Sequence, residues 1–305
     1  MERLRSRYLS VLGSSSVSRL AFWLILPSIL VIFPLIIYPI FSSLYLSFFT
    51  KELTNPFIGT PFVGLRNYID ILRDAAFWSS FWKTVYFTVV SISLEVVLGI
   101  AVAMLLNEKF VGRGVLRSLI LIPWALPVTV NGIMWKWIFN SSYGALNSLL
   151  YQLGLISSYR AWLSEPFMAM NMAIVAEVWK VTPLVVLLLL AALQTIPQQL
   201  YEAATVDGAS AWRRFRHITL PLLQPTILIV LVLRTLDAFK VFDLIFVMTR
   251  GGPANGTMVL SYFTYIRAFR FLNFGQGAAL SYIITLFIGL IALLYTRIMR
   301  SDIEY

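Results

Sequence analysis

The stretch Thr195–Pro221, TIPQQLYEAATVDGASAWRRFRHITLP, interrupts the apolar second half of the chain with polar and basic residues. Pro197 suits the first turn of a helix, because the N–H that proline lacks has no partner there. The run 198–206 places apolar side chains at i, i+3 and i+4 on one helical face. Gly208 suits the positive φ that ends a helix, and Ser210 is a good cap for the next one. The stretch therefore predicts two short helices at an angle, the second of which is closed by its final proline.

Patterning alone leaves two interpretations of this stretch open. It is either a solvated amphipathic loop between membrane spans or a surface on which another protein docks. The residue spacing favours the second interpretation. Glu202-Ala203-Ala204, then Gly208 after three residues, then Ile218-x-Leu220-Pro221 after nine more resemble the EAA signature of permease subunits in bacterial ABC importers.

In that family the signature forms a cytoplasmic coupling helix that sits in a cleft of the ATPase subunit. The resemblance therefore implies a polar contact to the ATPase by Glu202, a turn at Gly208, and packing by Ala203, Ala204 and Phe215. The full set of coupling residues that it implies is Glu202, Ala203, Ala204, Asp207, Gly208, Phe215, Ile218, Leu220 and Pro221.

The composition indicates that the chain is solvated by lipid. Hydrophobic residues make up 59% of the 305 residues, charged residues only 12%, and the mean hydropathy is +0.81. Soluble domains carry about 25% charged residues, and a compact core has no room for this many apolar side chains. The net charge of +10 flanks apolar spans rather than a solvated domain, so nucleic acid is not an expected partner. The absence of Cys excludes disulfides and thiolate metal sites.

The chain contains six stretches long and apolar enough to cross a bilayer, which requires about 20 residues each. They predict an all-α, polytopic membrane protein with six transmembrane helices, and the resemblance implies the type I ABC importer permease fold. Several prolines inside these stretches predict kinks that a packed bundle tolerates. The expected spans are Ala21–Phe48, Thr84–Leu106, Val115–Phe139, Phe167–Leu193, Leu222–Met248 and Gly277–Thr296.

Lys and Arg near the span ends predict the orientation. With the N-terminus in the cytoplasm, that side holds twelve of these residues and the other side eight over longer loops, which is the expected sign. Both termini and the stretch 195–221 then lie in the cytoplasm, in a bacterial plasma (inner) membrane. We expect a basic N-terminal tail over 1–20, a single permease domain over 21–300 and a short C-terminal tail over 301–305.

Further matches identify the type of permease. The segment 62–68, FVGLRNY, resembles the first external segment of sugar importer permeases. The run 236–243, LDAFKVFD, followed by Gly-Gly-Pro at 251–253, resembles the first of the two permeases in carbohydrate importers, the maltose or glycerol-phosphate type, as does 274–279. The resemblance covers the chain from about Ala21 to Arg300.

The resemblance implies a set of partners and a cargo. It implies a second, related permease in a heterodimer, two ATPase subunits that hold ATP and Mg, and an extracytoplasmic solute-binding protein. The expected cargo is a sugar, a di- or oligosaccharide first, with a polyol or glycerol-phosphate-like solute as the alternative. Carried over by spacing, the cargo-contacting positions are Lys180, Thr182, Leu184, Arg234, Asp237, Ala238 and Val241. Asn131 is a further candidate, bonding either a neighbouring helix or a sugar.

Charged residues inside spans are costly and face a bundle interior or a watery cavity. Arg234, Asp237, Lys240 and Asp243 alternate in sign at i+3 steps in the fifth span, so they form either a ladder of ion pairs along the helix or part of the translocation path. We expect Glu95 to pair with Lys136 across helices, and Glu177 to pair with Lys180 locally.

No enzyme chemistry is visible in the sequence. The chain has no GxxxxGK[ST] loop to hold the phosphates of ATP, so we expect no cofactor on this chain and a separate ATPase. His217 is the only His, which excludes a His-clustered metal site and a Ser-His-Asp triad built on any other His. An ion-driven secondary transporter would show inverted repeats, and none is visible. An intramembrane enzyme would need several catalytic residue types whose spacing brings them together, and the sequence shows no such set.

Overall fold

The computed structural model describes residues 14–54, 57 and 59–301. Within this part of the chain, extended backbone pairs only in two isolated β-bridges, Phe49–Phe62 and Glu52–Asn273, and the predicted all-α fold is confirmed. The helical elements, in chain order, are α2 (Ser14–Ile32), η1 (Phe33–Ile37), α3 (Tyr38–Ser47), α4 (Arg66–Arg73), α5 (Ala75–Asn107), α6 (Arg113–Leu119), α7 (Ile122–Ala125), α8 (Val128–Ile138), α9 (Ala145–Gln152), α10 (Pro166–Leu193), α11 (Gln198–Val206), α12 (Ala211–Arg214), η3 (Phe215–Thr219), α13 (Leu220–Ala238), α14 (Asp243–Met248), α15 (Leu260–Tyr265), η4 (Ile266–Arg270) and α16 (Phe274–Ser301).

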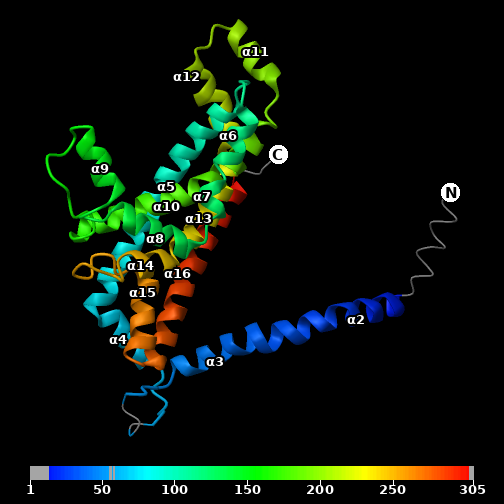
Figure 1. Cartoon of the computed structure of the whole chain (residues 1–305). Coiled ribbons are helices and arrows are strands. Elements are labelled where there is room, and N and C mark those ends of the chain that lie inside the picture. Colours follow the sequence, from blue (N-terminus) through cyan, green and yellow to red (C-terminus); the bar gives the residue numbers. More distant parts are fainter. Residues whose placement is uncertain (1–13, 55–56, 58, 302–305) are drawn as a thin grey trace.

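The bundle is built on α5 and α10, which pack along each other and against α13, while α16 packs on α3 and α13 (Figure 1). Three apolar clusters join the helices in the interior, one of them between α5, α15 and α16 around Phe77 and Leu280. A second lies around Ile174 and Leu244, where α5, α10 and α14 meet, and the third lies around Leu189 and Leu223 near the end that carries α11. The hairpin of α11 and α12 stands out at one end of this bundle (Figure 1).

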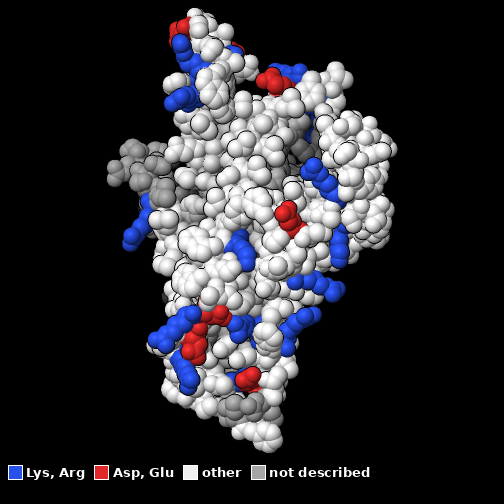
Figure 2. All heavy atoms as spheres, turned by 90° about the vertical axis from the view of Figure 1, so that its left-hand side faces the viewer, with Lys and Arg blue, Asp and Glu red and all other residues white. Residues whose placement is uncertain are grey.

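In the described part of the chain, five helices are long and apolar enough to cross a membrane, and a bent pair adds a sixth span if it is counted as one: Arg19–Ser47, Ala75–Asn107, Arg113–Ala125 with Val128–Ile138, Pro166–Leu193, Ala211–Ala238 and Phe274–Arg297. On the face drawn in Figure 2, charged side chains gather at the top and the bottom, and fewer are scattered over the largely uncharged middle. Both observations fit a polytopic membrane protein with six spans.

The third expected span, Val115–Phe139, is not one helix. It bends by 94° between α7 and α8. Leu126 is extended, with ψ 137, and Pro127 precedes α8 with ψ 142. A residue before proline avoids the helical region, and proline has no N–H to continue the hydrogen-bond ladder. The expected kink is therefore a complete break.

The fifth expected span, Leu222–Met248, is shorter than its apolar length suggests. Helix α13 ends at Ala238, and α14 begins only at Asp243 after an irregular turn. The hydroxyl of Ser261 donates a hydrogen bond to the carbonyl of Val241 and so satisfies one backbone group that the break frees. Helix α14 then packs against α8.

Pro221 does not close the second short helix, contrary to the sequence-based expectation. The chain stays helical from Ala211 to Ala238. A π turn, η3, lies directly before this proline, and its last bond runs from the Leu220 N–H to the Phe215 carbonyl. The same arrangement precedes Pro39, where the Tyr38 N–H bonds the Phe33 carbonyl. Wider turns before a proline relieve the clash of its ring with the preceding carbonyls and let the helix continue.

Helix α2 points away from the rest of the molecule (Figure 1). No residue in the most apolar window of Arg19–Ser47 is buried, and only α3, at its far end, packs on α16. Helix α2 also begins at Ser14, inside the stretch expected to be a tail over 1–20, whose first thirteen residues lie outside the described part. Of the expected tail over 301–305, only Ser301 is described, as the last residue of α16.

Candidate functional site

The hairpin of α11 and α12, which stands at the end of the bundle, carries the first part of the EAA-like signature, and the last part continues into η3 and α13 (Figure 1). No residue of α11 is buried. Gly208 makes the turn with φ +74, a conformation that glycine adopts without the steric cost of a Cβ. The Ser210 hydroxyl accepts a bond from the Arg213 N–H at 3.4 Å and caps the next helix. The hairpin is thus formed locally as the sequence predicts.

The predicted coupling residues lie on an accessible surface. Glu202, Ala203, Asp207 and Gly208 are exposed at the outer part of the hairpin, together with Leu220 and Pro221 at the base of α13. Ala204, Phe215 and Ile218 are half-buried.

The hairpin also exposes three large apolar side chains that lie outside the predicted coupling set. Val206 is 88% exposed, Trp212 68% and Leu200 43%. Exposed large apolar side chains on an otherwise polar hairpin are suited to a protein or membrane contact. The presence of Trp and Val in a polar loop is the sequence signal for this surface.

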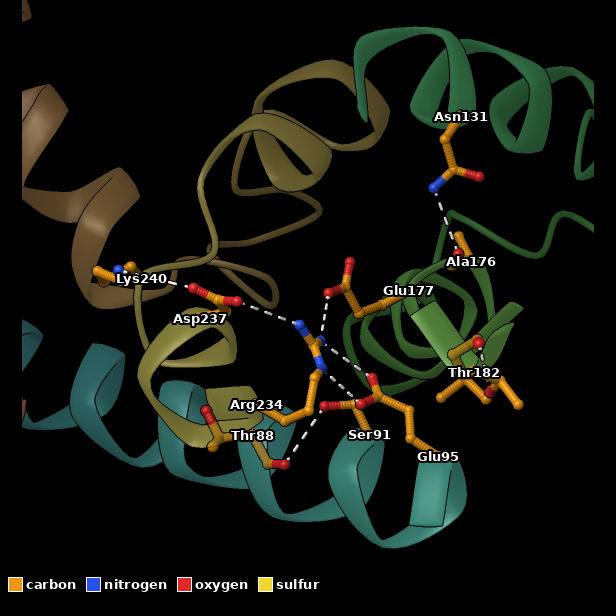
Figure 3. A network of polar contacts seen from close by, with 11 residues as sticks. Thr88, Ser91, Glu95, Asn131, Ala176, Glu177, Thr182, Arg234, Asp237 and Lys240 are labelled. Atoms are coloured by element: carbon orange, nitrogen blue, oxygen red, sulfur yellow. Dashed lines mark hydrogen bonds and ion pairs between the residues drawn. The ribbon is translucent and has the colours of Figure 1, made fainter. Parts of the chain in front are cut away.

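Buried charges form a second site in the middle of the bundle, where one guanidinium joins three helices (Figure 3). Arg234 in α13 donates from Nε to Glu95 Oε2 of α5 at 2.8 Å, and from Nη2 to Glu95 Oε1 at 3.2 Å. The same Nη2 donates to Glu177 Oε1 of α10 at 2.9 Å. All three residues are buried. A guanidinium is suited to this role because its planar array of five N–H donors serves two carboxylates at once.

The charge chain continues from the buried guanidinium to the surface. Asp237 Oδ2 lies 3.7 Å from Arg234 Nη1, and Asp237 Oδ1 lies 3.7 Å from Lys240 Nζ. The side chains of Asp237 and Lys240 are 62% and 57% exposed. Charged groups in a span avoid lipid and face water or another protein. This end of α13 therefore borders a watery space or a partner.

The sequence leaves two interpretations open for the charges along α13. In the structure, ion pairs at i+3 spacing link Arg234, Asp237 and Lys240, and no ion pair among the described residues reaches Asp243. The two expected lysine pairs are wrong. Glu95 and Glu177 both bind Arg234, and no carboxylate of the described chain forms an ion pair with Lys136 or Lys180.

The other predicted cargo positions form no side-chain hydrogen bond or ion pair with this network in the described structure. Asn131 is buried and donates from Nδ2 to the Ala176 carbonyl at 3.3 Å, while its Oδ1 has no partner in the described structure. Thr182 donates to the Val178 carbonyl of its own helix at 2.6 Å.

Burial varies among the remaining positions. Lys180 and Leu184 are half-buried, and Ala238 and Val241 lie inside an apolar cluster. Of the predicted cargo positions, only Arg234 and Asp237 are joined by an ion pair in the described structure.

Glu95 and Glu177 are the members of this network absent from the predicted cargo positions. A signal for them was present in the sequence, because a carboxylate inside an apolar span needs a compensating charge. Arg234 was not predicted as the partner of Glu95 and Glu177, because Lys136 and Lys180 are closer to these carboxylates along the sequence. Arg234 is 139 residues from Glu95.

Comparison with known proteins identifies the family. Residues 95–301 match the family described as "Binding-protein-dependent transport system inner membrane component". The chain is 43% identical over 286 residues, 93% of this chain and 94% of the relative, to the trehalose/maltose transport system permease protein MalF of Thermococcus litoralis. It is 37% identical to the sulfoquinovosyl glycerol transport system permease protein SmoG of Agrobacterium fabrum, over 92% of this chain and 91% of the relative.

A solved structure shares the whole fold. A chain of a bacterial ABC transporter involved in the import of the acidic polysaccharide alginate superposes with a TM-score of 0.82 at 21% identity, covering 97% of this chain and 100% of that one. The chain therefore belongs to the family of binding-protein-dependent transport system inner membrane components, the non-catalytic permease subunits of ABC importers.

Proposed function

We propose that this chain forms one half of the translocation path for a sugar, with a di- or oligosaccharide as the cargo. The observation that carries the proposal is the Asp237–Lys240 ion pair, which is exposed where the membrane-spanning helix α13 ends, beside a buried three-residue ion network. A charged pair exposed at the break of a span requires a polar path or a polar partner. Relatives whose names specify trehalose, maltose and sulfoquinovosyl glycerol support a sugar as the cargo.

The path needs a second wall, and we propose a related permease in a heterodimer. The apolar surface of α2, which nothing in the described chain covers, supports such a partner. Two ATPase subunits, holding ATP and Mg, would bind the α11–α12 hairpin of each permease. An extracytoplasmic binding protein would deliver the cargo, and one structural neighbour is a transporter in complex with a periplasmic protein. Both termini of this chain would then lie in the cytoplasm.

In the mechanism that we propose, ATP closes the ATPase dimer and draws the two hairpins together. The spans then open outward, the sugar passes from the binding protein to the path, and hydrolysis restores the inward-facing state. The residues of this chain neither bind nor hydrolyse ATP in this cycle. They bind the cargo and transmit the movement.

An anionic cargo, such as a glycerol-phosphate-like solute, is the second candidate. Its support from Arg234 is weak, because two carboxylates already occupy the guanidinium. Lys180 favours it, because this lysine forms no ion pair in the described structure. A neutral sugar instead needs hydrogen-bond acceptors, which Asp237 supplies on the exposed side of α13.

Uptake into proteoliposomes tests the proposal. The permease would be purified with its partner permease and ATPase, reconstituted, and supplied with the binding protein and labelled trehalose, maltose or glycerol phosphate. The proposal predicts uptake that requires ATP and persists when ion gradients are collapsed. Uptake that stops with the ion gradient and ignores ATP would instead indicate an ion-coupled secondary transporter.

A further inference from the structure

The coupling hairpin is attached to the bundle by few contacts. Helix α11 has no buried residue. A cavity of about 480 Å³ separates the hairpin from the end of α5, with Asn107 and Glu108 on one wall and Tyr201 and Phe215 on the other. The links at each end of α11 are non-helical, residues 194–197 toward α10 and the Gly208 turn toward α12. A force applied to α11 therefore needs a specific route into the spans.

Two side-chain hydrogen bonds cross the hairpin. Near its tip, Arg214 Nη1 donates to Thr205 Oγ1 at 2.8 Å, between exposed or half-buried groups. At its base, the hydroxyls of Tyr201 and Thr219 are 2.9 Å apart. Thr219 is only 3% exposed. Tyr201 is half-buried, and both residues line the cavity beside the hairpin, so the bond lies where the hairpin meets the start of α13.

Thr219 lies at the junction between the hairpin and the transmembrane helix α13. It is the last residue of the π turn η3, directly before α13 and two residues before Pro221. From there α13 is helical to Arg234, a distance of about 22 Å at 1.5 Å per residue. Arg234 is in turn bonded to α5 and α10. A movement of Thr219 is therefore applied at one end of a helix whose other end is held by two neighbouring spans.

We propose that the Tyr201–Thr219 hydrogen bond transmits displacement of the coupling helix to α13, and that Tyr201 is a positioning residue for transport. The ATPase moves α11, Tyr201 draws Thr219 with it, and the wide π turn before Pro221 bends to accept the movement. Helix α13 then tilts about its attachment at Arg234. This role rests on the proposed function, since it needs an ATPase bound to the hairpin.

Tyr201→Phe, Thr219→Val and the double variant test the proposal, because each removes hydroxyl groups and little volume. The purified transporter with its ATPase and binding protein would be reconstituted, and the number of trehalose or maltose molecules imported per ATP hydrolysed would be measured. We expect this ratio to fall about fivefold in either single variant, the effect of one hydrogen bond on a conformational equilibrium. The double variant should match the single ones, because residues that act through one shared bond are not additive.

Three controls make the outcomes distinct. Thr219→Ser keeps the hydroxyl and should keep the wild-type ratio. Tyr151→Phe changes an exposed tyrosine of α9, far along the chain from the hairpin, and should also keep it. Thermal unfolding of the complex reports stability separately from coupling.

The inference is overturned if Tyr201→Phe assembles with the ATPase and imports sugar at the wild-type ratio. It is also overturned if the variants only lower the unfolding temperature, since the bond would then be purely structural. If the wild-type complex itself shows no ATP-dependent import with either sugar, the proposed function fails, and the inference fails with it.

Discussion

The ion network around Arg234 and the α11–α12 hairpin are built in opposite ways. The network is buried, joins three helices, and satisfies a guanidinium with two carboxylates. The hairpin is exposed, has no buried residue in α11, and turns at a glycine with positive φ. The difference shows how a transport subunit separates a rigid internal joint from a surface that awaits a partner. Stability should depend on the first region and association on the second.

The largest expected effect is on stability, from Arg234→Met. The substitution leaves Glu95 and Glu177 buried without a counter-charge, so we expect a loss of about 3–5 kcal/mol in the free energy of unfolding. Thermal unfolding in lipid nanodiscs measures it. Adding Glu95→Gln and Glu177→Gln should restore much of the loss, because the uncompensated charges are then gone. An unchanged unfolding temperature in the single variant would mean that water reaches the network.

Gly208→Val should give the next effect, and only at the hairpin. A β-branched residue at φ +74 is strained, by about 1–2 kcal/mol for the left-handed conformation. We expect about tenfold weaker ATPase association in a pull-down titration and an unchanged unfolding temperature for the bundle. Gly114→Val is the matched control, because Gly114 has ordinary φ and open space around its Cβ position. If both variants lost ATPase association equally, the positive φ of the Gly208 turn would not be the cause of the loss.

Trp212→Ser tests the apolar surface of the hairpin. Exposed side chains away from special contacts change stability by only about 0.5 kcal/mol or less. Buried aromatic contacts in an interface commonly cost more than 1 kcal/mol when truncated. We therefore expect several-fold weaker binding of the ATPase with unchanged unfolding. Full ATPase affinity would show that this tryptophan meets lipid headgroups instead.

Asp237→Asn should have only a small effect on stability. The side chain is 62% exposed, and its ion pairs span 3.7 Å, so solvent screening leaves them worth less than about 1 kcal/mol. Sugar import should nevertheless fall several-fold, with the change in KM rather than in ATPase assembly. An unfolding temperature that drops as far as in Arg234→Met would place Asp237 inside the structural network rather than on the path.

Local structure was predictable where short-range chemistry decides it. The limits of α11, the Gly208 turn and the Ser210 cap follow from residues within the same few turns. The spans follow from apolar length, since lipid admits few alternatives to a helix. The break at Leu126–Pro127 was visible only as a kink, because the size of a bend depends on what packs against it.

The partners inside the bundle were not predictable from spacing. Glu95, Glu177 and Arg234 are far apart in the chain, and only the packing of α5, α10 and α13 brings them together. Sequence distance favoured the nearer lysines. The end of α13 at Ala238 was not predictable either. The mostly apolar stretch continues to Met248, and the hydrogen bond that stabilises the break comes from Ser261, which is distant along the sequence.

Cross-linking from the hairpin tests the central claim, that α11 is the surface that binds the ATPase. The chain has no Cys, so Ala203→Cys and Tyr151→Cys each create one site for a photoreactive maleimide. The account predicts a covalent adduct of this permease with the ATPase from the label at 203, and none from the label at 151. An adduct from the label at 151, or none from the label at 203 in an assembled complex, would contradict it.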